Sequence, residues 1–209
     1  MSKERRLGAV VAVNAAMVVA LVLVGLFAHS LGVLASGADY LGDGAGTALS
    51  LFAVYMRRRR RADQRLTSYA ALTNAGLLLL VTAAVAADAV YRLARGAPAI
   101  HSVPVIVVSV VAALAMIACA AILGDVSGDL NMQSVMLDTV ADAAAAIGVA
   151  LSACVILATG ATYWLDSAVA LLIALVVGYH ASRLLLEVRA DLRSRPTPAA
   201  GSHTHGTRA

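Results

Sequence analysis

Six long apolar stretches, separated by short polar segments, occupy most of the chain. They are rich in Ala, Val, Leu and Ile, and each is about as long as the 20 residues that an α-helix needs to cross a lipid bilayer. The stretches cover approximately residues 7–28, 33–56, 69–93, 103–123, 132–158 and 164–188. Backbone amides inside lipid have to be hydrogen-bonded within their own segment, which favours helices. The pattern predicts an all-α, polytopic membrane protein with six transmembrane helices.

The composition excludes most other classes of protein. Of the 209 residues, 61% are hydrophobic and 13% are charged, whereas soluble domains are about 45–50% apolar and about 25% charged. So much apolar surface cannot be hidden in one soluble core of this size, and it also excludes intrinsic disorder of the whole chain. The two cysteines, Cys119 and Cys154, lie inside apolar stretches. We interpret both as small core residues rather than as a disulfide or a metal pair.

Basic residues are distributed unequally between the two sides of the predicted membrane domain. With six helices, fourteen of the 16 Lys and Arg residues fall on the side of the two termini, and only Arg92 and Arg95 fall on the other. The positive-inside rule then places both termini in the cytoplasm of a bacterial-type plasma membrane. Orientation, together with contact between anionic lipid and the arginine run at 57–61, explains the net charge of +4. No nucleic-acid partner is expected.

The ends of the chain differ in character from the apolar stretches. We divide the chain into a cytosolic N-terminus over 1–6, a six-helix transport domain over 7–188 and a disordered cytosolic tail over 189–209. The tail is rich in Pro, Gly, Ser and His, which is typical of disorder. His203 and His205 offer imidazole ligands there, and the sequence leaves open whether they bind metal.

Four aspartates lie well inside two of the apolar stretches. Asp39 and Asp43 belong to the second stretch, and Asp138 and Asp142 belong to the fifth. The i, i+4 spacing places both carboxylates of a pair on one helix face, about 6 Å apart along the axis. A carboxylate near the middle of a bilayer costs about 2.5–3.5 kcal/mol on insertion scales. Neither stretch contains Lys or Arg, so the cost has to be offset by a bound cation, by protons or by a water-filled cavity.

We interpret the aspartates as a site for a divalent cation. Two converging pairs supply up to four oxygen ligands. Crowded carboxylates in a poorly solvated site favour protonation, so a metal ion has to displace protons. Two alternatives stay open: the aspartates reach water at the membrane surface, or they form interhelical hydrogen bonds that serve packing alone. Gly42 and Gly46, with Ala141 and Ala145, are expected to let the two aspartate-bearing helices approach closely.

Two further acidic residues lie near the ends of apolar stretches. Asp88 precedes Arg92 by four residues, a spacing that predicts a structural ion pair on one helix. Asp166 begins the sixth stretch. We expect it to cap its own helix or to interact with the dipole of that helix.

Several segments of the chain resemble motifs of the cation diffusion facilitator family, the proton-coupled exporters of divalent metals. HSLGVLASGADYLGD at 29–43 is similar to the motif of the family's second helix, and DLNMQSVMLDTVAD at 129–142 is similar to that of its fifth. RLTSYAALTN at 65–74, DAVYRL at 88–93 and YWLDS at 163–167 resemble motifs of its third and sixth helices. The segments occur in the family's order, and the resemblance is specific in combination.

The resemblance implies a six-helix transmembrane domain that holds a metal between its second and fifth helices. The implied ligands are Asp39, Asp43, Asp138 and Asp142, and the metal leaves the cytosol by alternating access in exchange for protons. Many zinc-transporting members have His at one or both of the positions held here by Asp39 and Asp138. An all-oxygen site tolerates harder ions such as Mn²⁺. Manganese and zinc are therefore the expected cargoes, with iron, cobalt and cadmium as further options.

Members of the family usually carry a cytosolic ferredoxin-like domain after the transmembrane helices. About 21 residues follow residue 188, fewer than the roughly 40 residues below which an isolated domain is difficult to fold. The sequence therefore predicts a transmembrane domain without that unit and leaves a homodimer open.

The predicted function is a proton-coupled antiporter that exports a divalent transition metal from the cytoplasm. The alternatives are a metal or proton channel without obligatory exchange, and a non-transporting membrane partner of another subunit. The expected partners are divalent metal ions, protons and membrane lipid. No catalytic residue, resident cofactor or enzyme activity is predicted, because no constellation of a nucleophile and a base occurs in the sequence.

Overall fold

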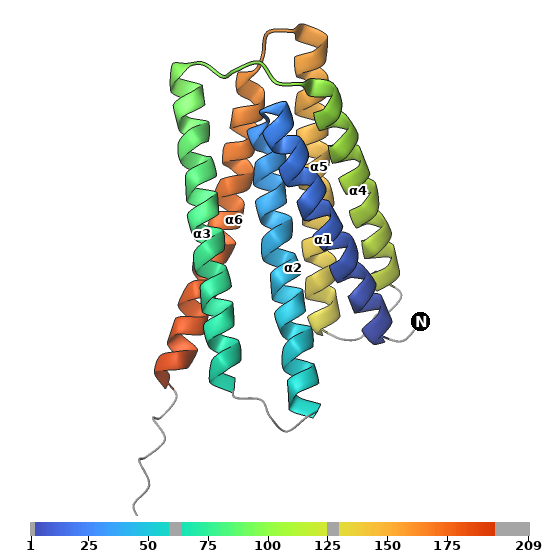
Figure 1. Cartoon of the computed structure of the whole chain (residues 1–209), viewed down its shortest axis with the longest axis vertical. Helices are drawn as coiled ribbons and strands as arrows, with labels where there is room; N and C mark the ends of the chain where they lie inside the picture. The colour runs from blue at the N-terminus through green and yellow to red at the C-terminus, as the bar shows by residue number, and fades with distance from the viewer. Residues whose placement is uncertain (1–2, 59–63, 125–129, 195–209) are drawn as a thin grey trace, which may run out of the picture.

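The computed structural model describes the backbone of residues 3–58, 64–124 and 130–194, and the side chains of residues 8–9, 11–45, 48, 72–121 and 139–190. Every regular element in these ranges is an α-helix (Figure 1). The helices are α1 (Lys3–Ala28), α2 (Leu31–Arg58), α3 (Gln64–Arg95), α4 (Ser102–Gly124), α5 (Leu130–Thr159) and α6 (Trp164–Ser194). The predicted all-α class and the six predicted helices are confirmed.

The first and last helices extend beyond the predicted limits of the transport domain. Helix α1 begins at Lys3, ahead of residue 7, and α6 continues to Ser194, past residue 188. Residues 189–194 are thus helical, not part of a disordered tail. The remainder of the predicted tail, with His203 and His205, lies outside the described residues.

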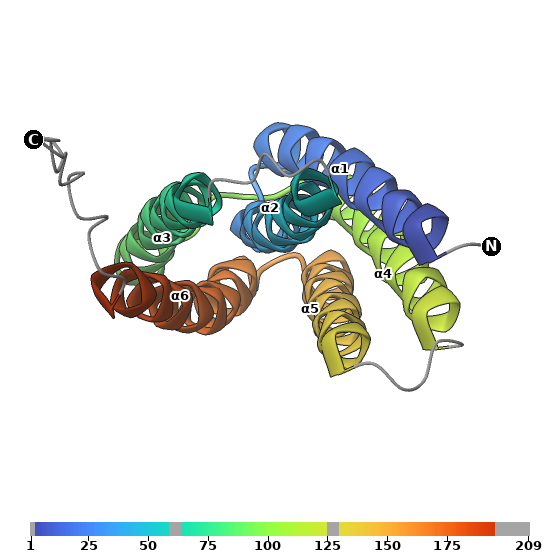
Figure 2. The same cartoon turned by 90° about the horizontal axis from the view of Figure 1, so that it is seen from below.

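Five of the helices contain a described stretch that is long and apolar enough to cross a membrane. These stretches are Val11–Ala28, Leu72–Arg95, Ser102–Ala121, Thr139–Thr159 and Trp164–Ala190. Helix α2, of which only the side chains of residues 31–45 and 48 are described, lies in the middle of the bundle (Figure 2), in contact with α1, α3, α5 and α6. The described part of the chain forms six helices, and the chain is a polytopic membrane protein.

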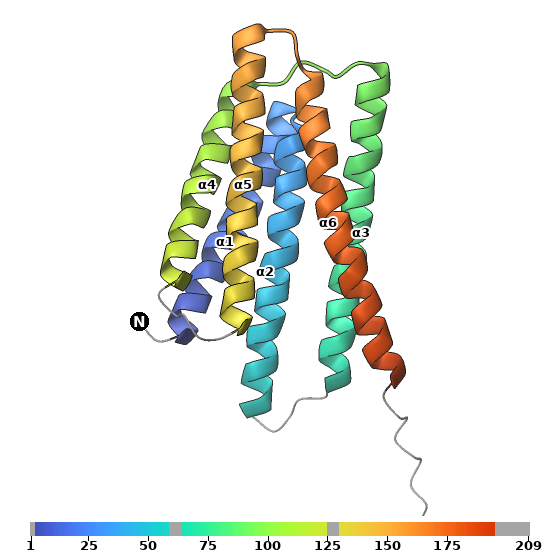
Figure 3. The ribbon, with the colours of Figure 1, turned by 180° about the vertical axis from the view of Figure 1, so that it is seen from behind.

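Successive helices run in opposite directions. Helix α1 begins and α6 ends at the same end of the bundle, which we call the lower end, as drawn in Figure 1. The connections from α1 to α2, α3 to α4 and α5 to α6 lie at the opposite, upper end (Figure 3). Helix α3 packs mainly against α6, and α4 packs mainly against α5. The two ends of the helical domain therefore lie on one side, as an even number of crossings requires.

Glycines end two of the helices at the upper end. Gly96 (φ 104°) follows α3, and Gly160 (φ 65°) follows α5. The amide of Gly96 donates to the carbonyl of Arg92 (2.9 Å), and the amide of Gly160 donates to the carbonyl of Ile156 (2.8 Å). These are left-handed helix caps, a conformation that costs glycine little because it has no Cβ.

Small residues build much of the interior, and large apolar residues face outward. Ala112 and Ala153 are fully buried, whereas Leu114 is among the exposed large side chains, as expected for a surface in contact with lipid. Cys119 is buried, and Cys154 is exposed on α5. The prediction that both cysteines are core residues is right for Cys119 and wrong for Cys154.

The close approach predicted at Gly42 is made to a different helix. A Cβ on Gly42 would lie 2.5 Å from Leu78 Cδ2, so this glycine lets α2 approach α3. Ala141 is exposed on α5. The interpretation that these two residues bring α2 and α5 together is therefore wrong. Helix α2 approaches α5 nearer the upper end, where a Cβ on Gly32 would lie 3.4 Å from Val149 Cγ1.

Candidate metal centre

The described aspartates of α2 and α5 face the interior part of the bundle. Asp39 and Asp43 are one helical turn apart on α2, and both are half-buried. Asp142 on α5 is 3% exposed. Helix α2 is central in the bundle and contacts α5, so these side chains lie where the two helices pack.

Three of the predicted site residues are brought together. One carboxylate oxygen each from Asp39, Asp43 and Asp142 can be chosen so that all three lie within 4.8 Å of one another. Oxygen ligands bound about 2.0–2.6 Å from a divalent ion lie roughly 3–4 Å apart. Small changes of side-chain torsion would close that difference, so the arrangement suits a divalent cation.

Asp138 is the fourth predicted site residue. Its backbone belongs to α5, but its side chain lies outside the described residues. It precedes Asp142 by one helical turn, which places it on the same face about 6 Å nearer the lower end. Its role as a ligand stays a prediction.

Ionised carboxylates at this separation repel one another strongly. Two unit charges 4.8 Å apart repel by about 3 kcal/mol at an effective dielectric constant of 20. Helix α5 contains no basic residue, and those of α2 are Arg57 and Arg58 at its lower end. The centre therefore favours the binding of a cation or of protons.

Tyr40 is a neighbour of this centre that the sequence analysis did not single out. It lies between Asp39 and Asp43 in the sequence. Its side chain is 0% exposed, and it is the largest of the fully buried side chains among the described residues. Its hydroxyl has no hydrogen-bond partner among the described residues, although a buried tyrosine usually finds one. The sequence does contain a signal for Tyr40, because this tyrosine lies between the two aspartates of a D-x-x-x-D spacing in an apolar stretch.

Asp166 binds a different helix from the one predicted. Its Oδ1 accepts hydrogen bonds from Ser30 Oγ (2.6 Å) and from the amide of Gly32 (3.3 Å), and its Oδ2 accepts one from the amide of Leu31 (2.7 Å). The expectation that Asp166 caps its own helix is wrong, because its carboxylate caps the start of α2. Sequence reasoning missed this contact because it joins residues 135 positions apart.

The ion pair predicted between Asp88 and Arg92 is confirmed. Arg92 Nη2 lies 3.0 Å from Asp88 Oδ2, and Arg92 Nε donates to the same oxygen at 3.1 Å. Arg92 Nη1 also donates to the carbonyl of His29 (2.8 Å). The pair thus ties the upper end of α3 to the turn between α1 and α2.

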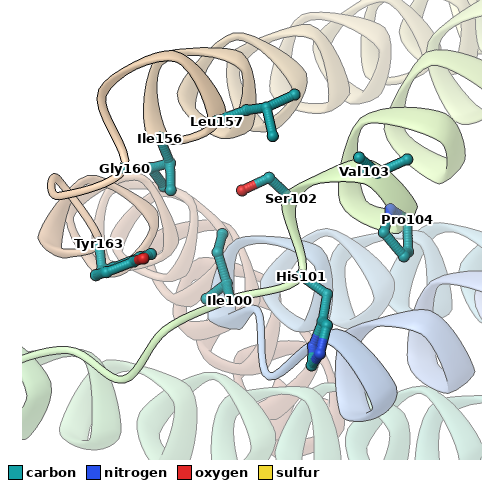
Figure 4. A pocket seen from close by; sticks show the side chains of 9 residues that line it. All are labelled: Ile100, His101, Ser102, Val103, Pro104, Ile156, Leu157, Gly160 and Tyr163. Atoms are coloured by element: carbon teal, nitrogen blue, oxygen red, sulfur yellow. The ribbon is translucent and has the colours of Figure 1, made fainter.

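A pocket opens at the upper end, away from the aspartates. It has a volume of about 280 Å³ and lies between the start of α4 and the end of α5. Figure 4 shows Ser102, Ile156 and Tyr163 among the side chains that line it. No carboxylate is among its lining residues, so this pocket does not supply ligands for a cation.

The fold and the acidic cluster define a class of protein, a polytopic helical membrane protein with a carboxylate centre between two helices. The sequence pattern of the cation efflux transmembrane domain matches residues 7–192, and the chain belongs to this family. This membership confirms the resemblance drawn from the motifs of the second, third, fifth and sixth helices.

Several bacterial proteins are similar to this chain. The zinc transporter ZitB of Yersinia pseudotuberculosis is 29% identical over 194 residues, which cover 89% of this chain and 62% of ZitB. ZitB of Pectobacterium atrosepticum is 30% identical over 192 residues, 88% of this chain and 59% of the relative. The metal cation efflux system protein CzcD of Cupriavidus metallidurans is 30% identical over 181 residues, 83% and 57% respectively. The chain thus spans about three-fifths of the length of the curated relatives it matches.

Proposed function

We propose that this protein exports a divalent transition-metal cation from the cytoplasm across a bacterial plasma membrane in exchange for protons. Asp39, Asp43, Asp138 and Asp142 are the proposed metal ligands and proton acceptors. The observation that carries the proposal is the convergence of three carboxylates from α2 and α5 within 4.8 Å. Membership of the cation efflux family supports export, rather than uptake, as the direction of transport.

The chemistry of the ligands limits the proposed cargo. Carboxylate oxygens suit Mn²⁺ and similar hard ions, whereas a borderline ion such as Zn²⁺ prefers a site that includes nitrogen or sulfur. Zinc is nevertheless the metal of the ZitB relatives. We therefore propose Mn²⁺ or Zn²⁺ as the cargo, and competition between the two ions for one site measures the preference.

Exchange with protons follows from the crowding of the carboxylates. Because each ionised pair repels by about 3 kcal/mol, the centre without metal retains protons, and an arriving divalent ion displaces them. On the opposite side of the membrane, protons that enter the centre displace the metal. The same carboxylates therefore bind both ions in turn, which couples the two fluxes.

Proteoliposomes test the proposed exchange. An acidic lumen is expected to drive the uptake of Mn²⁺ or Zn²⁺, and this uptake should make the lumen more alkaline. Asp142→Asn is expected to abolish both signals. Asp88→Asn, which alters a carboxylate of the ion pair at the upper end, is the matched control and should keep them.

Two results would contradict the proposal. Metal flux that moves no protons would indicate a channel, and an absence of any flux would favour a non-transporting partner. Calorimetry in buffers of different ionisation enthalpy adds an independent measurement, since metal binding is expected to release protons. A homodimer stays a prediction, which the mass of the detergent-solubilised protein tests.

A further inference from the structure

The carboxylate of Asp166 occupies a buried junction between three helices. Asp166 is 1% exposed and lies in the first turn of α6. Its two oxygens accept three hydrogen bonds, one from Ser30, which precedes α2, and two from the first two residues of α2. Ser30 Oγ in turn accepts a hydrogen bond from the amide of Val33 (3.2 Å). The first three amides of α2 are therefore bound either by Asp166 or by the serine that Asp166 orients.

Gly32 is the residue that lets these helices meet. A Cβ at this position would lie 3.0 Å from Asp166 Oδ1 and 3.4 Å from both methyl groups of Val149 on α5. The first distance is tighter than nine in ten real contacts of a Cβ atom, and the second is at the near limit of ordinary van der Waals contact. The start of α2 is thus packed against α6 and α5 at one point, and Val149 is fully buried there.

The junction is linked to the acidic cluster by continuous helix. From Leu31 to Asp39 the rise along α2 is about 12 Å, and from Val149 to Asp142 the rise along α5 is about 10 Å. Both paths lie within single helices, which transmit displacement with little deformation. A slip of α2 by one residue would move Asp39 and Asp43 by about 1.5 Å relative to Asp142.

We propose that Asp166 is a positioning residue of the metal centre: by holding the first amides of α2 against α6 and α5, it sets the register in which Asp39 and Asp43 meet Asp142. This inference rests on the proposed metal site. Asp166 touches neither the cluster nor the metal, and it acts through the backbone of α2. The charge of the carboxylate also suits this place, because the N-terminus of a helix carries a partial positive charge.

Two variants disturb the junction in different ways. Asp166→Asn keeps the size of the side chain but turns an NH₂ group toward one of the three donors that now share the carboxylate. Gly32→Ala leaves the charge of Asp166 intact and forces the junction apart by a few tenths of an ångström. Gly148→Ala is the matched control, since Gly148 is next to Val149 on α5 but a Cβ on Gly148 meets nothing within 4 Å.

Metal binding is the first measurement. Calorimetry with Mn²⁺ and with Zn²⁺ on the purified full chain is expected to give dissociation constants about 10–100-fold higher for both junction variants, because mutation of residues that orient metal ligands typically has effects of that size. Gly148→Ala is expected to bind like the wild type. Circular dichroism checks that the helix content of each variant is unchanged.

The register of the helices is the second measurement, and it needs no metal. Spin labels at the exposed positions Leu41 on α2 and Leu151 on α5, in a background without Cys119 and Cys154, report the distance between these helices. We expect the distance distribution to shift in Asp166→Asn and in Gly32→Ala, and to stay unchanged in Gly148→Ala.

The two measurements separate the inference from the proposed function. A wild type that binds neither ion would overturn the proposed function, and the label distance would still decide whether Asp166 sets the register. Junction variants with normal metal affinity and normal label distance, but a lower unfolding temperature, would show that Asp166 is only a stabilising cap. If Asp166→Asn does not fold, Gly32→Ala decides the question.

Discussion

Replacing Asp142 by Asn is expected to raise the stability of the metal-free protein while removing its metal binding. Asn has the shape of Asp without its charge, and Asp142 is 3% exposed with an oxygen within 4.8 Å of those of Asp39 and Asp43. Each ionised pair at that distance costs about 3 kcal/mol at an effective dielectric constant of 20, and bound protons already relieve part of this repulsion. We therefore expect the free energy of unfolding to rise by about 1–3 kcal/mol. At this chain length, each kcal/mol corresponds to a rise of roughly 2–4 °C in the unfolding temperature.

Metal should reverse the order of stability of the wild type and the Asp142→Asn variant. An ion at 100 times its dissociation constant stabilises the folded state by about 2.7 kcal/mol, so the wild type should gain stability with Mn²⁺ or Zn²⁺ and Asp142→Asn should not. Thermal unfolding in detergent, followed by circular dichroism, measures both effects. Asp88→Asn serves as the control and should retain the gain from metal. The reasoning is refuted if Asp142→Asn is less stable than the wild type without metal and is still stabilised by it.

Three further substitutions test the energetics of the upper end by thermal unfolding. Ser167→Ala removes a buried hydroxyl without a hydrogen-bond partner among the described residues, and it should raise the free energy of unfolding by about 1 kcal/mol; a loss of stability would reveal a partner for this hydroxyl. Arg92→Ala removes the contacts with Asp88 and with the carbonyl of His29 and should cost about 1 kcal/mol while leaving metal affinity unchanged. Gly160→Ala places a Cβ at φ 65° and should cost about 1–2 kcal/mol; an unchanged unfolding temperature would contradict the left-handed cap.

The helices were predictable because lipid imposes a simple rule on the sequence. Segments that cross a bilayer have to be apolar over about 20 residues and helical throughout, so the six apolar stretches correspond to α1 to α6. The limits at Lys3 and Ser194 were missed because the polar ends of the helices carry no such constraint. The exposure of Cys154 was missed because a fully apolar stretch does not reveal which of its faces meets lipid.

The candidate site was predictable only in part. The i, i+4 spacing places Asp39 beside Asp43 on one helix face, and this much follows from helical geometry. That α5 brings Asp142 to the same place is a tertiary fact, which the sequence indicated only through the cost of carboxylates in lipid and through resemblance to a family. The contact of Gly42 with Leu78 and the cap made by Asp166 were not predictable for the same reason, since each joins two helices whose packing no local pattern specifies.

The cap at Asp166 also bears on how the charge of the acidic cluster is balanced. The N-terminus of α2 is a source of positive potential on the same helix as Asp39 and Asp43, but such potential is confined to the first turn, and the carboxylate of Asp166 already occupies it. The basic residues of α2 are at its lower end, and α5 has none. Within these two helices, no fixed positive charge is therefore placed to neutralise the cluster. The proposed exchange would balance the cluster by ions that arrive and leave, either metal or protons, whereas a fixed positive charge held permanently at this place would keep the cluster in one state of charge.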